Sequence, residues 1–367
     1  MKLAIVCDDL IQFGGAEKIV EELSDMYPDA PLYTSVASEK WLERFSQKGR
    51  IVKISFLQKF PFAVKLNRYY SAFFLHTLAF ESFDFSEFDV VISSSSRFAH
   101  HIITKPTTKH ICYMHSPGRM FWESDSYFEN EKFGFLKPFR FLSKSFLKMA
   151  LCYLRIVDFN AAQNVDVFIA NSLATKRKIE KYYRRDSEVI HPFINYKDFE
   201  NVSPKGKDYF LVVTRLAPWK RVDVAVEACN ALELPLRVYG EGPDFERLKS
   251  LASPTIEVLG YLNDKDKADV MRNCKALIVT QKEDFGIVPL EVMACGKPVI
   301  AYKAGGVLES IFEGMTGEFF DQQSSDCLAN VLSSFDTKKY SPADCKERAK
   351  SFSQSFFQKE IKRLVKV

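Results

Sequence analysis

The chain has 367 residues, of which 47% are hydrophobic and 27% are charged, and its formal net charge at pH 7 is +4. This composition is that of a globular protein, and it excludes disordered, collagen-like and disulfide-stapled chains. At about 150 residues per domain, the length predicts two domains. So small a net charge argues against a dedicated nucleic-acid-binding protein, and we expect no nucleic acid among its partners.

The first apolar run, residues 3–7, ends at Asp8 and Asp9 and is too short for a signal peptide. No run approaches the roughly 18 apolar residues that cross a bilayer. The eight cysteines are scattered without metal-ligand spacing. We therefore expect a cytoplasmic protein with reduced thiols, either soluble or peripheral on the inner face of the cell membrane.

The first half of the chain alternates short apolar runs with helical segments. Strands are expected at residues 3–7, 89–93, 110–114 and 165–170, and helices at 16–26 and 174–183. Such runs are typical of parallel strands that are buried on both faces. The pattern lapses into a polar stretch at residues 202–207, which contains Pro204 and Gly206. We expect the domain boundary there.

From residue 209 the alternation is more regular. Strands are expected at residues 209–214, 236–239, 256–259, 276–280 and 298–302, and helices at 221–232, 245–251, 266–273 and 288–294. This repeat predicts an α/β fold with a doubly wound parallel sheet. We place an N-terminal Rossmann-like domain at 1–203, a C-terminal one at 204–350, and a helix at 351–367 that we expect to pack back on the first domain.

A glycine turn follows the strand that ends at Thr280. Gly286 precedes a helix that begins near Ile287, and the free N–H groups at such a helix start attract a phosphate. Glu283 lies before the turn and Glu291 lies on the helix, so two carboxylates can accept hydrogen bonds from hydroxyls on either side of a bound pyrophosphate. Taken alone, such a pair is more often a solvated cap and a surface charge.

The neighbouring motifs favour a more specific interpretation. Together with this turn, residues 214–221, 239–243, 283–306 and 314–317 resemble the retaining glycosyltransferases of family 4. That family has the GT-B architecture, in which two Rossmann-like domains face each other across a cleft. Its signature of two glutamates separated by seven residues is intact. Residues 14–17, 89–95 and 113–119 resemble one subgroup, the mannosyltransferases of bacterial O-antigen assembly, so the resemblance covers almost the entire chain.

The resemblance implies that Arg215 and Lys220 bind the donor pyrophosphate. Chemistry agrees, because cleaving a nucleotide sugar leaves negative charge on the departing phosphate, which two cations and a helix start stabilise most in the transition state. No metal and no cofactor are then required. Asp264 and Asp266 match the Asp-x-Asp motif of metal-dependent glycosyltransferases. They precede a helical segment, however, and we interpret them as helix caps.

The remaining donor contacts are also implied by the resemblance. Glu283 is expected to hold hydroxyls of the transferred sugar, and Glu291 the ribose. The backbone is expected to bind the phosphate at Gly286, Ile287 and Val288, and to approach it closely from the N-terminal domain at Gly14 and Gly15.

His115 ends the apolar run 110–114, and Pro117 and Gly118 stop the strand from continuing. In related enzymes a histidine here contacts the donor sugar, so we expect His115 to position the reacting carbon and stabilise charge. A lone histidine is more often structural. Arg119 is a weaker candidate that either binds the acceptor or a phosphate, or caps a helix.

Charge is unevenly distributed over the first domain. Residues 1–44 carry four basic and nine acidic residues, a sum of −5, whereas residues 45–157 carry sixteen and eight, a sum of +8. Residues 53–80 and 132–157 contain no acid and interleave lysine and arginine with phenylalanine. This pattern favours an anionic membrane surface as a partner. The alternative is a buried core helix with a solvated basic face.

These observations predict a retaining, metal-independent hexosyltransferase that acts in cell-surface polysaccharide synthesis in a bacterium. The best guess for the donor is GDP-mannose, which rests on the subgroup resemblance alone, and the acceptor is a lipid-linked glycan or a polysaccharide. Two alternatives stay open. One is a sugar-nucleotide epimerase or a phosphorylase of the same fold, and the other is a non-catalytic nucleotide- or glycan-binding protein.

Overall fold

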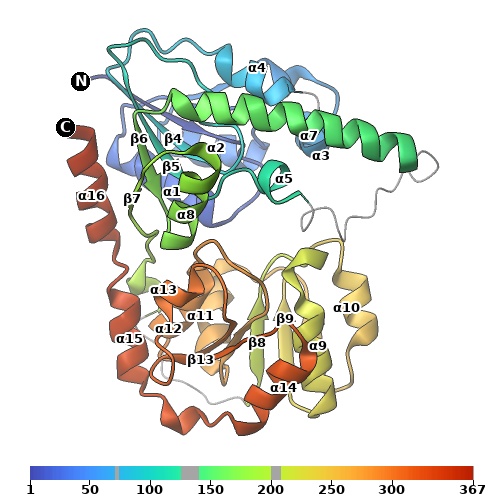
Figure 1. The fold of residues 1–367 in the computed structure, drawn as a ribbon. Coiled ribbons are helices and arrows are strands. Elements are labelled where there is room, and N and C mark those ends of the chain that lie inside the picture. The colour runs from blue at the N-terminus through green and yellow to red at the C-terminus, as the bar shows by residue number, and fades with distance from the viewer. Residues whose placement is uncertain (71–73, 125–139, 200–207, 367) are drawn as a thin grey trace. The chain divides into compact units, whose positions relative to one another are not determined.

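The computed structural model describes residues 1–70, 74–124, 140–199 and 208–366 (Figure 1). The chain divides into two compact units, one made of Met1–Ile190 with Glu360–Val367 and the other of His191–Lys359. The division therefore falls earlier than the boundary expected at residue 203, which lies outside the described residues. It also passes through the last helix, α16 (Gln354–Lys366).

The first unit is built on a seven-stranded parallel sheet in the order β3-β2-β1-β4-β5-β6-β7. Every residue of β1 and β4 is buried, as expected for central strands covered on both faces. The strand order reverses between β1 and β4, and open α/β sheets bind ligands at the carboxyl ends of the strands at such a point. The strands are β1 (Leu3–Cys7), β2 (Leu32–Thr34), β3 (Val52–Ile54), β4 (Val90–Ser95), β5 (Lys109–Met114), β6 (Val167–Ala170) and β7 (Glu188–Val189).

The longest helix of this unit, α7, has two apolar faces. Leu151 and Leu154 are buried, whereas Met149, Tyr153 and Ile156 are exposed. The helix therefore has a core-facing side, as in the alternative given above, and also presents an apolar outer surface. The helices of the unit are α1 (Gly15–Met26), α2 (Glu39–Gln47), α3 (Ala63–Tyr70), α4 (Leu75–Glu81), α5 (Arg119–Trp122), α7 (Arg140–Gln163) and α8 (Leu173–Tyr183), with a short turn η1 (Phe56–Lys59).

The second unit has a six-stranded parallel sheet in the order β10-β9-β8-β11-β12-β13. Successive residues of a strand point to opposite faces, so Leu211 joins one hydrophobic cluster while Phe210 and Val212 join the other. The order reverses between β8 and β11, and their carboxyl ends are the expected ligand-binding edge. The strands are β8 (Phe210–Val213), β9 (Leu236–Tyr239), β10 (Ile256–Leu259), β11 (Leu277–Val279), β12 (Val299–Tyr302) and β13 (Gly317–Phe320).

Helices cover this second sheet and complete its two clusters. They are α9 (Val222–Ala231), α10 (Phe245–Leu251), α11 (Asp264–Asn273), α12 (Ile287–Ala294), α13 (Val307–Ser310), α14 (Ser325–Ser334) and α15 (Pro342–Lys350), with short turns η4 (Tyr196–Phe199), η5 (Pro218–Lys220) and η6 (Thr337–Lys339). The two parallel-sheet units confirm the α/β fold with two Rossmann-like domains. No helix in the described part of the chain is long and apolar enough to span a membrane.

The end of α16 is fastened to the first unit. Lys109 Nζ donates to the carbonyl of Leu364 at 2.9 Å, and Arg363 forms an ion pair with Glu188. These contacts give a physical reason for Glu360–Val367 to group with the first unit although the rest of α16 belongs to the second.

Candidate functional site

In the second unit, the loops after β8 and β11 are joined by an ion pair. Lys220 Nζ lies 3.0 Å from Glu283 Oε1, and the two side chains are 11% and 20% exposed. The amide of Gln281 donates to the same carboxylate oxygen. Thr280 Oγ1 donates to the Lys220 carbonyl at 2.9 Å, which fixes the backbone beneath the lysine. A cation and a carboxylate predicted from separate motifs are therefore neighbours.

Trp219 brings Arg215 to the same place. Lys220 Nζ lies 4.5 Å from the centre of the indole ring, and Arg215 Cζ lies 5.9 Å from it. Both distances are within the range of cation–π attraction. Two cations are thus held beside one aromatic ring, an arrangement suited to binding a phosphate group.

Two glycines after β9 allow the loop that carries Arg215 to pack closely. A Cβ atom on Gly240 would lie 1.9 Å from the Thr214 carbonyl oxygen, and one on Gly242 would lie 2.2 Å from the Leu216 oxygen. Leu216 N–H donates to Glu241 at 2.9 Å, and Leu216 accepts from Asp244 N–H at 3.0 Å. This interlocking fixes the backbone on both sides of Arg215.

The glycine turn before α12 has the geometry that its sequence predicts. Gly286 has φ +91° and directly precedes Ile287, the first residue of α12. The Glu283 carbonyl accepts from Gly306 N–H at 2.8 Å, and a Cβ atom on Gly305 would lie 2.0 Å from that carbonyl oxygen. The first N–H groups of α12 thus follow directly after the loop that carries Glu283, at a helix start of the kind that binds anions.

Glu291 differs from the surface charge that an isolated reading suggests. It is buried, and Lys267 Nζ on α11 lies 2.5 Å from its Oε2. Lys267 is a site residue that sequence reasoning missed, because nothing in the sequence of α11 marks which glutamate it meets. Its positive charge keeps the carboxylate of Glu291 compensated inside the protein.

In the first unit, Gly14 precedes α1 and Gly15 is its first residue. A Cβ atom on Gly14 would lie 2.9 Å from Glu17 Oε2, so the glycine makes room for that carboxylate. Burial raises the pKa of Glu17 to about 7. A carboxyl group with a pKa near physiological pH therefore lies next to Gly14. Sequence reasoning did not identify this group.

The loop after β4 is anchored by Asp8, at the end of β1. The two oxygens of Asp8 accept from the backbone N–H groups of four successive residues, at distances between 2.5 and 3.1 Å: Ser96, Arg97, Phe98 and Ala99. The Arg97 guanidinium bonds to Asp9, which also accepts from Asn67 at 3.0 Å. These contacts fix Arg97 at the carboxyl edge of the sheet. Arg97 is a second basic residue that sequence reasoning missed.

His115 lies at the carboxyl end of β5 and is half-buried. Its Nε2 lies 2.8 Å from Ser94 Oγ, and its backbone N–H donates to Ser95 at 2.8 Å. Its carbonyl accepts from Asn171 Nδ2 at 2.9 Å and from Thr175 Oγ1 at 3.2 Å. Three neighbouring elements therefore fix both the ring and the backbone of His115.

Arg119 is the first residue of α5, and its side chain lies beside Glu123, with Nε 4.0 Å from Oε2. Lys178 from α8 also approaches Glu123, at 2.9 Å. Arg119 thus pairs with a carboxylate four residues further along the chain. Basic groups nevertheless collect here, directly after His115.

One group in the described part of the chain could hold a metal ion: His100, His101 and Asp158, whose donor atoms lie within 4.8 Å of one another. This buried group does not include the Asp-x-Asp sequence of the second unit. There Asn263 is the residue that caps α11, since its Oδ1 accepts from Asp266 N–H at 2.9 Å. The expected caps at Asp264 and Asp266 are therefore corrected to Asn263.

Family models match both halves of the chain. The model of "Glycosyltransferase Family 4" matches residues 13–198, and that of "Glycosyl transferases group 1" matches residues 194–352. The chain belongs to the family 4 glycosyltransferases. This confirms the family resemblance stated above, and mannosyltransferases are among the relatives.

The relatives of this glycosyltransferase are distant. It is 27% identical to human alpha-1,3/1,6-mannosyltransferase ALG2 over 266 residues, which is 63% of this chain and 61% of that protein. It is 26% identical over 201 residues to the uncharacterized glycosyltransferase MJ1178 of Methanocaldococcus jannaschii, 53% of this chain and 57% of that one. A match of 32% over 136 residues to the GDP-mannose-dependent alpha-mannosyltransferase of Mycobacterium tuberculosis covers 35% of this chain and 36% of that one. The chain thus spans about three fifths or less of these relatives.

Solved structures share its fold. Anabaena HepE in complex with UDP-glucose has a TM-score of 0.72 at 18% identity, and the match covers 100% of both chains. Sucrose-phosphate synthase from Thermosynechococcus elongatus has a TM-score of 0.72 at 15% identity, covering 100% of this chain and 98% of that one. At these identities the likeness shows the two-domain fold alone.

Proposed function

We propose that this glycosyltransferase transfers a hexose with retention of anomeric configuration and without a metal ion. The observation that carries the proposal is the Lys220–Glu283 pair, which Trp219 joins to Arg215 beside the first turn of α12. This loop edge offers cations and backbone N–H groups to a diphosphate and a carboxylate to sugar hydroxyls. A nucleotide sugar carries both of these groups.

The reaction needs charge stabilisation more than acid–base chemistry. The bond between the anomeric carbon and the phosphate oxygen breaks, and the acceptor oxygen bonds to the same face of that carbon. The acceptor proton passes to the departing phosphate oxygen. Arg215, Lys220 and the start of α12 stabilise the charge that develops there, while His115 orients the sugar.

For the donor we propose GDP-mannose. Support comes from the relatives, which include a mannosyltransferase and a GDP-mannose-dependent mannosyltransferase. UDP-glucose is the competing donor, because a protein of the same fold binds it. For the acceptor we propose a lipid-linked glycan or a polysaccharide in cell-surface glycan synthesis.

We also propose that the first unit docks on an anionic membrane, where a lipid-linked acceptor would be found. The exposed apolar face of α7 contains Met149, Tyr153 and Ile156, at the spacing of one helix face. It lies within the acid-free stretch 132–157, whose first residues fall outside the described part. In the other acid-free stretch, Phe62 and Leu78 are exposed whereas Phe80 is buried. Apolar and basic groups together suit an anionic bilayer surface.

Two measurements test the proposal in order. A thermal-shift panel of GDP, UDP and dTDP identifies the base, because a ligand that binds only the folded state raises stability. Incubation with GDP-mannose and a lipid-linked acceptor extract, followed by NMR of the product, then reports the anomer, with and without EDTA. An inverted anomer, or activity that EDTA abolishes and Mg²⁺ restores, would overturn the mechanism. Nucleotide binding without any transfer or epimerisation would favour the non-catalytic alternative.

Membrane docking has its own test. Co-sedimentation with anionic vesicles should capture the wild type, and the double variant Met149→Glu with Ile156→Glu should stay in the supernatant. Leu308→Glu in the second unit, which also replaces an exposed apolar residue, is the control and should still sediment. Equal capture by anionic and neutral vesicles would contradict the electrostatic part of the proposal.

A further inference from the structure

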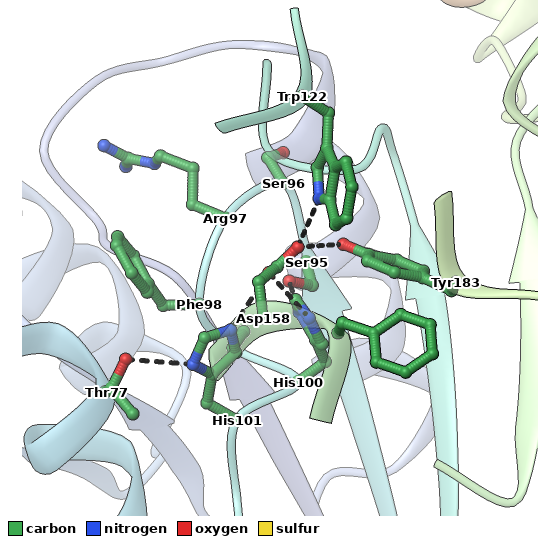
Figure 2. A network of polar contacts seen from close by, with 12 residues as sticks. Thr77, Ser95, Ser96, Arg97, Phe98, His100, His101, Trp122, Asp158 and Tyr183 are labelled. Carbon is green, nitrogen blue, oxygen red and sulfur yellow. Dashed lines mark hydrogen bonds and ion pairs between the residues drawn. The ribbon is translucent and has the colours of Figure 1, made fainter. Parts of the chain in front are cut away.

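A buried carboxylate on α7 lies against polar atoms of four residues from different elements (Figure 2). Asp158 Oδ2 accepts from Trp122 Nε1 at 2.6 Å and from Tyr183 Oη at 2.9 Å. Its Oδ1 lies 3.1 Å from His101 Nε2 and 3.2 Å from His100 Nε2. The side chains of Asp158 and both histidines are fully buried.

Two of these contacts lead to the segment that carries His115. Trp122 is at the far end of residues 115–122, and its indole reaches Asp158 directly. At the near end, the His115 N–H donates to the Ser95 carbonyl at 2.8 Å, and Ser95 Oγ lies 2.9 Å from His100 Nδ1. Both ends of the segment are therefore tied to the same carboxylate, one directly and one through Ser95 and His100.

The electrostatics of this network favour a fixed anion at Asp158. Burial alone would raise the pKa of Asp158, but the polar contacts that His100 and His101 make with its carboxylate hold that pKa below its usual range. Burial lowers the pKa of His101, which favours its neutral form. A buried carboxylate that accepts hydrogen bonds from several elements at once restricts the groups around it to one arrangement.

We propose that Asp158 is a positioning residue for glycosyl transfer, which fixes segment 115–122 and thereby sets the location of His115 and Arg119. The proposal rests on the transfer function proposed above. Displacement of a positioned group by about 1 Å can lower a rate by about a hundredfold. Loosening one end of the segment should therefore lower kcat without weakening nucleotide binding by the loops of the second unit.

Trp122→Phe and Tyr183→Phe form a matched pair of variants. Each removes one hydrogen bond to the same oxygen of Asp158 and keeps an aromatic ring, but only Trp122 belongs to segment 115–122. We expect Trp122→Phe to lower kcat by tenfold or more, and Tyr183→Phe to keep it within about threefold. The Kd of the nucleoside diphosphate should be unchanged in both. Equal kcat losses that follow the loss in Tm, or no loss in either variant, would overturn the proposal.

Hydrogen exchange gives a readout that does not depend on activity. Trp122→Phe should speed amide exchange in residues 116–122, whereas Tyr183→Phe should not. Unchanged exchange in Trp122→Phe would show that the tether does not hold the segment. If the segment loosens but the wild type transfers no sugar, the function has failed and the role in transfer fails with it, while the tether stands.

Asp158→Asn separates hydrogen bonding from metal binding. Its amide oxygen can still accept from Trp122, and its NH₂ can donate to the histidines if both rings change tautomer and donate from Nδ1 to the hydroxyls of Ser95 and Thr77. We therefore expect the variant to fold and to retain kcat within about fivefold. One equivalent of zinc in the purified wild type that is lost in the variant, together with loss of activity, would overturn the proposal by making Asp158 a metal ligand.

Discussion

Lys220→Ala is the sharpest test of the proposed chemistry. The substitution removes the amine that lies 3.0 Å from Glu283 Oε1 and 4.5 Å from the Trp219 ring centre. Loss of one group that stabilises developing charge typically costs about 3 kcal/mol in the transition state. That energy corresponds to a kcat about a hundredfold lower.

The effect on folding should be much smaller. The two side chains of the pair are partly exposed, so its contribution to stability is about 1 kcal/mol or less. A change of that size lowers the Tm of a domain of this length by about 2–4 °C. Lys220→Ala should therefore lose most of its activity while it stays folded. The kcat is measured at a temperature well below the Tm of the variant.

Two further variants complete this test. In the double variant Lys220→Ala with Glu283→Gln, the neutral amide no longer needs a cation, so stability should recover while kcat stays low. Lys303→Ala removes another lysine–glutamate pair of the same unit, 3.1 Å from Glu313, and should leave kcat unchanged. Steady-state transfer assays with near-normal kcat in Lys220→Ala would refute the assignment of this lysine to the departing phosphate.

Three other outcomes are expected. By calorimetry, Glu283→Gln should weaken the binding of the intact donor far more than the binding of the free nucleoside diphosphate, whereas Glu291→Gln should weaken the binding of both ligands. Equal losses of affinity in the two variants would mean that one carboxylate is misassigned. In Gly305→Ala the new Cβ would lie 2.0 Å from the Glu283 carbonyl oxygen, so the variant should be less stable by about 2 kcal/mol and should bind the donor more weakly. Gly260 has open space around it, so Gly260→Ala should change neither the stability nor the donor binding in the same melting and binding assays. Because burial raises the pKa of Glu17 from 4.5 to about 7, the folded state resists ionisation, and stability should fall as the pH rises from about 4.5 through 7. Glu17→Gln should remove this slope, and urea unfolding at about pH 5 and about pH 8 that shows the same slope in both proteins would contradict it.

Backbone features of the fold and site were predictable because they leave local signals in the sequence. The strand 276–280 followed by a glycine turn and a helix is present as β11, Gly286 and α12. The strands that sequence reasoning missed are short, such as β2 and β7, or lie outside the regular repeat, such as β13. Their apolar runs are too brief to stand out from loop sequence.

Side-chain partners were not predictable in the same way. Glu291 was identified from its motif, but its partner Lys267 lies on a different helix. His101 and Asp158 are 57 positions apart, and only the packing of α7 against the sheet brings them together. The spacing of apolar residues predicts which face of an element is buried. It does not predict which polar group of another element lies against that face.

The two units treat backbone N–H groups at their switch points differently, and this difference bears on where the phosphate binds. In the first unit, Asp8 occupies the N–H groups of residues 96–99 with its own carboxylate. That loop therefore has no such donors left for an anionic ligand. In the second unit, α12 begins after Gly286, which has no side chain with which to cap the first N–H groups of the helix. These N–H groups, together with Arg215 and Lys220, are the groups to which the proposed function assigns the diphosphate of the donor.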